Sequence, residues 1–378
     1  MKFPSIFAPR FGYTKLLSLL IIWSKQKFII GELNGLNMLN VIFISSFYGQ
    51  LKFCIITYMN LYPYDSIISN AMDALIPSDY LYVNSLLLIP EKGEKWILDL
   101  PNTVDVSTVV LHAQDYLHIS PNGDSEELDE IERFQSTHGI KNLILLHWNH
   151  RLSEIYNGTL RLIEFPSHSH DLVQGLIKSK NEWSDVNIRH HELNYMCLNG
   201  IPKPHRKDTY KYLRTLGIPS VITPLQSTPL HVFPTYTNYD YDNIKNYISL
   251  LDVYKSAPIN VITESLYDEP IGIITEKTLF AMSSMQLPIL IAHKGAVADV
   301  ESYGFDVFHD IIDHSYDTMP NESRWKSAID LNIHVLNGEL DYDSLVDRLK
   351  KNQEHLINNY LGYIETKLVK QLTDIVNS

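Results

Sequence analysis

Short apolar runs separated by longer polar segments form the main pattern of this chain. In the first half the runs fall at residues 41–47, 53–57, 86–90, 108–111, 143–147 and 160–165. Runs of this length, rich in Val, Ile and Leu, predict buried strands, and the polar segments between them predict connecting helices. The same rhythm resumes near Tyr195 and continues to Asp313. The pattern therefore predicts an α/β protein.

Two segments carry clear helix signals. Residues 125–138 place Glu126, Glu127 and Asp129 in a first turn, where acidic side chains favour the helix dipole, and Gly139 ends the helix. The residues after about 340 predict a last long amphipathic helix. Its apolar positions are Leu345, Leu349, Leu356, Tyr360, Ile364, Leu368 and Ile375.

Residues 259–292 predict a strand, a loop, a helix and a second strand in succession. The runs 259–262 and 288–292 suit buried strands, and Thr275 is a plausible N-cap for the helix between them. A narrow buried face of that helix is predicted from Leu279, Phe280, Ser283 and Ser284. Loops at the carboxyl ends of strands in open parallel sheets bind ligands, so Glu276 and Lys277 are expected at a crevice.

A second stretch of interest, residues 195–214, predicts a strand, a turn and a helix that begins near Pro204. Cationic side chains gather at the start of this helix: Lys203, His205, Arg206 and Lys207. Each exposed cation there costs about 0.3–1 kcal/mol against the helix dipole. An anion in the loop would reverse the sign of that cost, and a phosphate or diphosphate is the natural candidate.

Both loops also have ordinary interpretations. The cationic segment would serve equally as a solvated basic turn, Glu276 as a stabiliser of its own helix, and Lys277 as an exposed side chain. Together, however, a cationic loop and a loop with an acid and a base suit a nucleoside diphosphate. The cations can bind its phosphates, and the carboxylate can accept hydrogen bonds from its ribose hydroxyls. No GxGxxG or GxxxxGK[ST] motif occurs, so dinucleotide and P-loop chemistry have no support.

Composition limits the classes of protein that fit. The 378 residues suit two domains of ordinary size, and the 45% hydrophobic content is that of a globular protein. A formal net charge of -13 argues against a broad nucleic-acid-binding surface. Cys54 and Cys197 are the two cysteines and form no CxxC pair, which favours a reducing compartment and a cytoplasmic location.

The amino-terminal residues resemble a targeting segment in outline. Residues 15–23 place a basic residue before an apolar core, but no small-x-small cleavage site follows, and the run is too short to cross a bilayer. We therefore predict no transmembrane segment. Because residues 38–46 have the strand-then-small-residue pattern expected at the start of an α/β domain, we interpret residues 1–37 as a loosely attached or disordered extension, or as the product of an upstream start codon. The expected domains are residues 38–190 and 191–340, with a boundary near 180–194 and a helical segment at 341–378.

Residues 274–281, Ile-Thr-Glu-Lys-Thr-Leu-Phe-Ala, followed by Gln-Leu-Pro-Ile-Leu, resemble the donor-binding signature of the α1,3-fucosyltransferase-like glycosyltransferases. A closer resemblance is to glycosyltransferase-like proteins of large phages and algal viruses. It rests on four segments in the same order, at residues 197–206, 263–264, 274–278 and 304–313. The resemblance covers residues 195 to about 330, and the amino-terminal half lies outside it.

The resemblance implies a GT-B arrangement, in which two Rossmann-like domains face each other across a cleft. It implies that Glu276 binds the ribose of a nucleotide sugar, that Lys277 binds the diphosphate, and that Arg206 with His205 binds phosphates from the other loop. The full set of expected donor-binding residues is Asn199, Lys203, His205, Arg206, Glu264, Thr275, Glu276 and Lys277. This chain has Ile-Gly-Ile-Ile at 271–274 where the fucosyltransferase motif has aromatic and acidic residues, so guanine and fucose recognition do not follow.

Catalysis in such an enzyme would use helix N-termini and cations in place of a metal ion or a cofactor. Asp240 and Asp242 have the spacing of a metal motif but lie in a Tyr- and Asn-rich segment, so we predict no metal site. An inverting transfer needs a general base, and the candidates at strand ends are Asp115, His147 and Glu164. Each fits an ordinary structural role as well.

Two functions remain open from the sequence. The first is transfer of a sugar from a nucleotide sugar to an acceptor hydroxyl on a glycan, a lipid or a modified nucleic-acid base, in the host cytoplasm if the protein is viral. The second is a non-catalytic protein that keeps the cleft to bind a sugar nucleotide or a partner.

Overall fold

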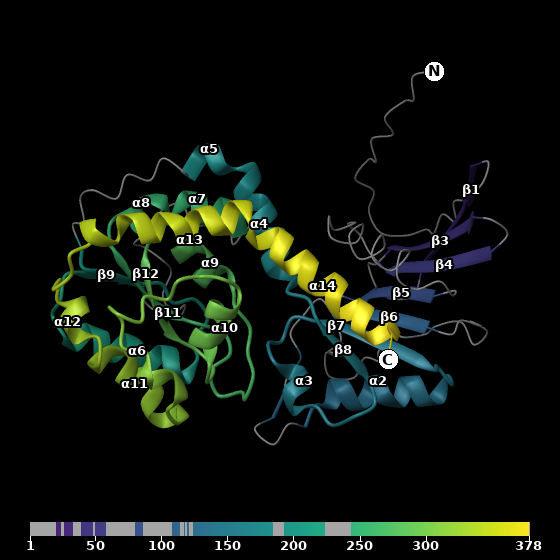
Figure 1. The fold of residues 1–378 in the computed structure, drawn as a ribbon, viewed down its shortest axis with the longest axis horizontal. Helices are drawn as coiled ribbons and strands as arrows, with labels where there is room; N and C mark the ends of the chain where they lie inside the picture. Colours follow the sequence, from purple (N-terminus) through teal and green to yellow (C-terminus); the bar gives the residue numbers. More distant parts are fainter. Residues whose placement is uncertain are drawn as a thin grey trace.

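The computed structural model has two lobes, each built on its own β-sheet (Figure 1). It describes the backbone of five amino-terminal strands and then residues 108–113, 117, 119–120, 124–183, 193–223 and 243–377. Within these residues, no helix is long and apolar enough to cross a membrane.

The first sheet has eight strands in the order β1 to β8. They are β1 Leu20–Trp23, β2 Gln26–Glu32, β3 Leu39–Phe47, β4 Gln50–Thr57, β5 Tyr80–Ser85, β6 Thr108–Ala113, β7 Asn142–His147 and β8 Arg161–Glu164. Strands β1 to β4 pair antiparallel and β4 to β8 pair parallel. The prediction of an α/β rhythm from residue 38 onward is therefore wrong for β3 and β4, which are too close in sequence for a helix to join them.

The second sheet has four parallel strands in the order β10-β9-β11-β12. Its strands are β9 Tyr195–Cys197, β10 Ser220–Ile222, β11 Ile259–Thr263 and β12 Leu287–Ile291. The two strands predicted at 259–262 and 288–292 are confirmed as β11 and β12, and all five residues of each are buried. Complete burial explains why both sequences are largely apolar with no alternation, and the buried amide of Asn260 in β11 donates to Gln286 Oε1 over 2.9 Å.

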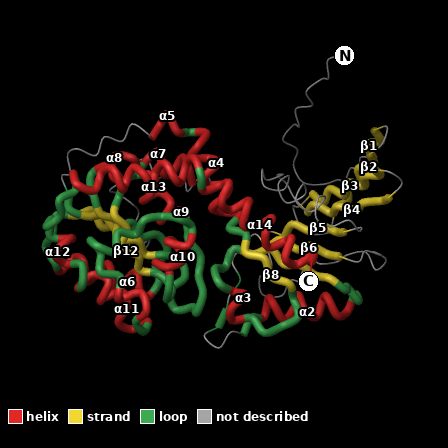
Figure 2. Tube along the Cα trace, in the orientation of Figure 1, coloured by secondary structure: helices red, strands yellow, loops and turns green. Residues whose placement is uncertain are grey.

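Helices cover both sheets, as Figure 2 shows in red. In the first lobe and at the junction they are α2 Glu126–Thr137, α3 Leu152–Ile155, α4 Ser167–Lys178 and α5 Lys180–Trp183. Those of the second lobe are α6 Pro204–Thr215, α7 Asn243–Ser249, α8 Leu251–Lys255, α9 Glu276–Ser283, α10 Ala296–Ser302, α11 Asn321–Asp330 and α12 Ile333–Leu336, with short 3₁₀ turns at Ser315–Thr318 and Asp343–Leu345.

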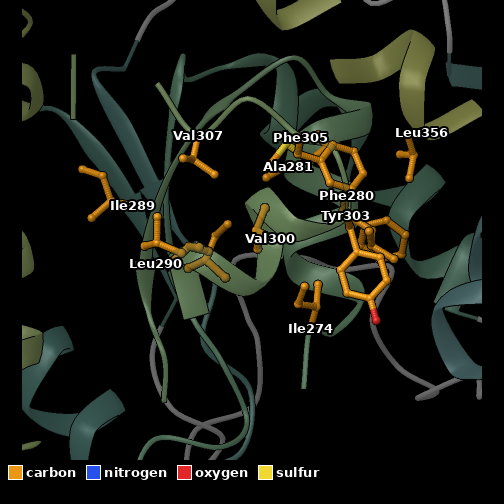
Figure 3. Close-up of a cluster of buried hydrophobic side chains, with 14 of the residues drawn as sticks. Ile274, Phe280, Ala281, Ile289, Leu290, Val300, Tyr303, Phe305, Val307 and Leu356 are labelled. Carbon is orange, nitrogen blue, oxygen red and sulfur yellow. The ribbon is translucent and has the colours of Figure 1, made fainter. Parts of the chain in front are cut away.

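The predicted helix ends agree with the structure. Ser125 caps α2 by accepting a hydrogen bond from the Leu128 N–H, and Gly139 follows it with a φ of 62°. Thr275 caps α9 in the same way, through the N–H of Lys277. The prediction of a narrow buried face on α9 is wrong, because every residue from Thr278 to Ser283 is buried. Figure 3 shows Phe280 and Ala281 of this helix among apolar side chains from several elements.

The carboxy-terminal segment is two helices where one was predicted. Helix α13 spans Val346–Asn358 and α14 spans Tyr360–Asn377, with Asn359 between them at a φ of -122°. The predicted apolar positions are buried from Leu345 to Leu368, and Ile375 is partly buried. Helix α14 leaves the second lobe and contacts β8 of the first, where the Arg161 guanidinium donates to the Ile375 carbonyl over 2.9 Å (Figure 1).

The predicted domain limits at residues 37/38 and 190/191 remain predictions, and the pairing of β1 and β2 and the contacts of α4 bear on them. Strands β1 and β2 lie inside the predicted extension 1–37 and pair within the first sheet, whereas the run predicted at 86–90 lies outside the described residues. Helix α4, which lies before the predicted boundary, contacts α7, α9, α13 and α14. The first lobe is thus joined to the second through α4 and α14.

Candidate functional site

The carboxyl ends of the parallel strands in the two sheets meet at the junction between the lobes. After β7, the backbone N–H of His150 donates to the Gly272 carbonyl in the loop between β11 and α9, over 2.8 Å. After β8, the hydroxyl of Ser169 donates to the Ile274 carbonyl in that same loop, over 3.3 Å. The loop that leads into α9 is therefore bonded to the first lobe at two points.

The two loops predicted to form one site lie together. Parallel strands β9 and β11 are neighbours in the sheet, so the loops that follow them share an edge. The ammonium group of Lys203 donates to the Ser265 carbonyl over 2.6 Å, and the His205 ring hydrogen-bonds the Glu264 carbonyl through Nε2 at 3.1 Å. The cationic start of α6 is thus attached to the β11–α9 loop.

His205 and Arg206 are buried parts of this attachment. The Arg206 guanidinium is 3% exposed and donates to the carbonyls of Ile201 at 3.0 Å and Thr263 at 3.1 Å. The His205 ring stacks on Tyr267 with centroids 4.6 Å apart. Burial, together with the nearby Arg206 charge, lowers the pKa of His205 to about 3, so the ring is neutral near pH 7. These contacts favour a bracing role for both side chains over direct phosphate contact.

Glu264 positions the start of α9. Its carboxylate accepts hydrogen bonds from the Thr275 N–H at 3.2 Å, the Thr278 hydroxyl at 2.7 Å and the Thr275 hydroxyl, and the residue is 2% exposed. Asn199 is also buried and accepts from the Thr263 hydroxyl at 2.8 Å. With their polar atoms engaged in this way, Asn199, Glu264 and Thr275 hold the loops in place.

Glu276 and Lys277 differ from these residues because their side chains reach solvent. They are 28% and 19% exposed, and the Lys277 ammonium lies 3.0 Å from Glu276 Oε1. Burial by itself would raise the pKa of Glu276, but the charges of Lys277 and His168 outweigh it and lower that pKa to about 2. At neutral pH the site therefore presents an ionised carboxylate, which can accept hydroxyl hydrogen bonds, beside a cation.

The structure describes two of the three residues predicted as the general base, His147 and Glu164. Asp115 lies outside the described residues. His147 is 1% exposed, and burial lowers its pKa to about 4, an effect that the Glu164 charge opposes only in part. Glu164 lies between the lobes and contacts His150 Nδ1 at 2.8 Å, the Lys367 ammonium at 3.0 Å and the Tyr303 hydroxyl.

The Glu164 carboxylate therefore has three partners, His150, Tyr303 and Lys367. Burial raises its pKa, but the hydrogen bond and charge of His150 and the charge of Lys367 prevail, and the pKa lies well below its usual range. A carboxylate that holds a cation of α14 and a hydroxyl at the end of α10 joins three parts of the chain. This favours a structural role for Glu164.

Sequence reasoning did not find the ion pair that links Arg151 of the first lobe to Asp299 of the second. Arg151 Nε lies 2.9 Å from Asp299 Oδ1, and Asp299 also contacts His293 Nε2 at 2.7 Å. The His293 ring occupies the space that a Cβ on Gly272 would need, with Nδ1 only 2.0 Å from that position. The available signal was position, because Arg151 and His293 each closely follow a predicted strand.

Other features of the described residues lie apart from this junction. A cavity of about 600 Å³ is lined by residues 309–315 and His334, and another of about 200 Å³ by residues near the end of α6 and β10. Within the described part of the chain, no group of three or more His, Cys, Asp or Glu side chains is arranged to hold a metal ion. Asp240 and Asp242 fall outside it.

Comparison with known proteins leaves the family open. No protein-family model matches the chain, and no curated protein does. Among solved structures, the chain is similar to the catalytic domain of starch synthase IV from Arabidopsis thaliana bound to ADP and acarbose, with 12% identity, 93% of this chain and 87% of that chain covered, and a TM-score of 0.39. A likeness this weak assigns no activity.

Proposed function

We propose that this protein is a glycosyltransferase with a GT-B arrangement that binds a nucleotide sugar at the start of α9. One observation carries the proposal: the cationic β9–α6 loop is attached to the loop that presents the partly exposed Glu276 and Lys277. In this assignment Glu276 accepts hydrogen bonds from the ribose hydroxyls, while Lys277 and the N–H groups at the start of α9 face the diphosphate. Lys203, next to the same loop, adds a further cation.

The proposed reaction needs neither a metal ion nor a cofactor. The acceptor hydroxyl oxygen attacks the anomeric carbon, and the bond from that carbon to the diphosphate oxygen breaks with its electron pair. The negative charge that develops on the departing diphosphate is stabilised by Lys277 and the N–H groups at the start of α9. The hydroxyl proton passes to a base of the first lobe, and attack opposite the leaving group inverts the anomeric centre.

The burial and contacts of the two described base candidates favour a second function, in which the protein binds a nucleotide sugar without transferring the sugar. Among the described candidates, His147 is buried and neutral near pH 7, and Glu164 is held by His150, Tyr303 and Lys367. A protein that binds a nucleotide sugar at Glu276 and Lys277 without transferring the sugar would show this arrangement. Binding without turnover of any donor would support it.

Replacement of Glu276 by Gln tests the ribose assignment. One acceptor oxygen becomes an NH₂ donor while the shape is kept, so we expect binding of a ribonucleoside diphosphate to weaken about tenfold, with little change in melting temperature. Discrimination between ribo and 2′-deoxy forms should shrink in the variant. Titration calorimetry with both forms measures this, and Glu301→Gln, at a 56% exposed glutamate, is the matched control.

If Glu276 serves only its own helix, the result is different. The substitution would then cost a few tenths to about 1 kcal/mol of stability and leave nucleotide affinity unchanged. Equal loss of affinity for ribo and 2′-deoxy forms would show that Glu276 acts on another part of the ligand.

A further inference from the structure

His168 brings a side chain of α4, the helix that joins the two lobes, to the candidate donor site. It is the second residue of α4, which begins shortly after the carboxyl end of β8. Its Nε2 lies 3.9 Å from Oε2 of Glu276, and the two side chains are 33% and 28% exposed. The remaining oxygen of Glu276, Oε1, is the one that Lys277 contacts. His168 therefore faces the carboxylate oxygen that Lys277 leaves open.

The position of the His168 ring is set by neighbours on both lobes. Its centroid lies 5.2 Å from that of Trp148, and Trp148 packs against Leu266 and Ile273 of the β11–α9 loop. The adjacent Ser169 is bonded to the Ile274 carbonyl of that loop. The imidazole is thus held at the start of α9 by contacts that do not involve Glu276.

The separation of His168 and Glu276 suggests a ligand atom between them. At 3.9 Å the two atoms are too far apart for a direct hydrogen bond, but one oxygen can lie about 2.8 Å from both. A hydroxyl group suits this place, because it can donate its proton to a carboxylate and accept one from an imidazole N–H. A phosphate oxygen does not suit it, because an ionised phosphate has no proton to donate to Glu276.

We propose that His168 binds the same ribose hydroxyl as Glu276, so that the donor site is completed by the helix that joins the two lobes. The inference rests on the proposed function, and it specifies that the vicinal hydroxyls of the nucleotide, rather than its phosphates, contact both α4 and α9. A nucleotide held in this way bridges the junction between β8 and α9. His168 is then a specificity-determining residue that favours ribonucleotides over deoxyribonucleotides.

The test compares His168→Ala with the parent protein in titration calorimetry. The probes are ADP, GDP and UDP, each with its 2′-deoxy and 3′-deoxy forms. Loss of one hydrogen bond should weaken binding of the ribo form about fivefold, and binding of the deoxy form that lacks the shared hydroxyl less than about twofold. His168→Gln, whose amide nitrogen can replace Nε2–H, should restore most of the affinity. His309→Ala, at a 58% exposed histidine, is the matched control.

A double-mutant cycle with Glu276→Gln adds a second readout. If both side chains hold one hydroxyl, His168→Ala should cost less in the Glu276→Gln background than in the parent. Unchanged affinity of His168→Ala for every nucleotide that the parent binds would overturn the inference. So would an equal loss for ribo and both deoxy forms.

The two proposals fail in different ways. If the parent binds none of the nucleoside diphosphates, the proposed function is contradicted and this inference falls with it. If the parent binds one of them and Glu276→Gln weakens that binding while His168→Ala does not, the proposed function stands and the role of His168 alone is wrong.

Discussion

Acidification from about pH 7.5 to about pH 5.5 is expected to lower the free energy of unfolding by about 3 kcal/mol. The cause is the burial of neutral histidines. Burial lowers the pKa of His112 to about 3, of His147 to about 4 and of His205 to about 3. In the unfolded chain each ring binds a proton near pH 6.5, so below that pH the unfolded state binds more protons than the folded state.

The size of the effect follows from groups that act in opposite directions, of which four have a pKa shift large enough to count. Each of the three histidines removes about 1.4 kcal/mol per pH unit below 6.5, or about 4 kcal/mol together at pH 5.5. Asp317 acts in the opposite direction, because burial raises its pKa to about 6 and the folded state gains a proton there first. Asp317 therefore adds about 1 kcal/mol to the free energy of unfolding over the same interval. Burial also lowers the pKa of His293 and of His314, and both add to the loss of stability at low pH.

Urea unfolding at several pH values measures this change. A free energy of unfolding that stays constant between about pH 7.5 and pH 5.5 would contradict the burial of these histidines in neutral form.

Replacement of Lys277 by Ala is expected to weaken binding of a nucleoside diphosphate about ten- to hundredfold. The substitution removes a charge-assisted contact of about 1.5–3 kcal/mol to the diphosphate. Lys277 is 19% exposed, and its ammonium contacts Thr275 and Glu276 beside it, so the fold should persist with a nearly unchanged melting temperature. Lys350→Ala, at a 60% exposed lysine of α13, is the matched control.

Arg206→Ala should differ from Lys277→Ala in its effect on stability. It leaves the buried carbonyl of Thr263 without the guanidinium, at a cost of about 1–3 kcal/mol for an unsatisfied group. The Ile201 carbonyl also loses its partner, but Ile201 is exposed, so water can replace that bond. Any loss of nucleotide affinity should then come with a lower melting temperature. A stable Arg206→Ala protein with weakened binding would instead assign Arg206 to the phosphates.

The sequence predicted the parts of the site that depend on local signals. The apolar runs of β11 and β12 and the cap at Thr275 are short-range patterns, and the parallel-strand rule then placed Glu276 and Lys277 at the sheet edge. Pro204 at the first position of α6 fixed the start of the cationic helix in the same way.

The remaining features depend on contacts between distant parts of the chain. Glu164 meets Tyr303 and Lys367, which lie 139 and 203 residues away, and no periodicity in the sequence marks such a pairing. His205 and Arg206 appeared to be free cations, because the sequence does not show that the neighbouring loop supplies carbonyls to bind them. The apolar pattern of α13 and α14 continues in register through Asn359, so it gave no sign of the break.

The most direct test of the proposed function is release of nucleoside diphosphate from a panel of ADP-, GDP- and UDP-sugars. Slow release without an added acceptor is expected from at least one donor, because water can replace the acceptor hydroxyl, and Lys277→Ala should reduce that release at least about tenfold. Tight binding of a donor without release would favour the non-catalytic alternative. Neither binding nor release from any donor in the panel would contradict the assignment of Glu276 and Lys277 to a nucleotide sugar.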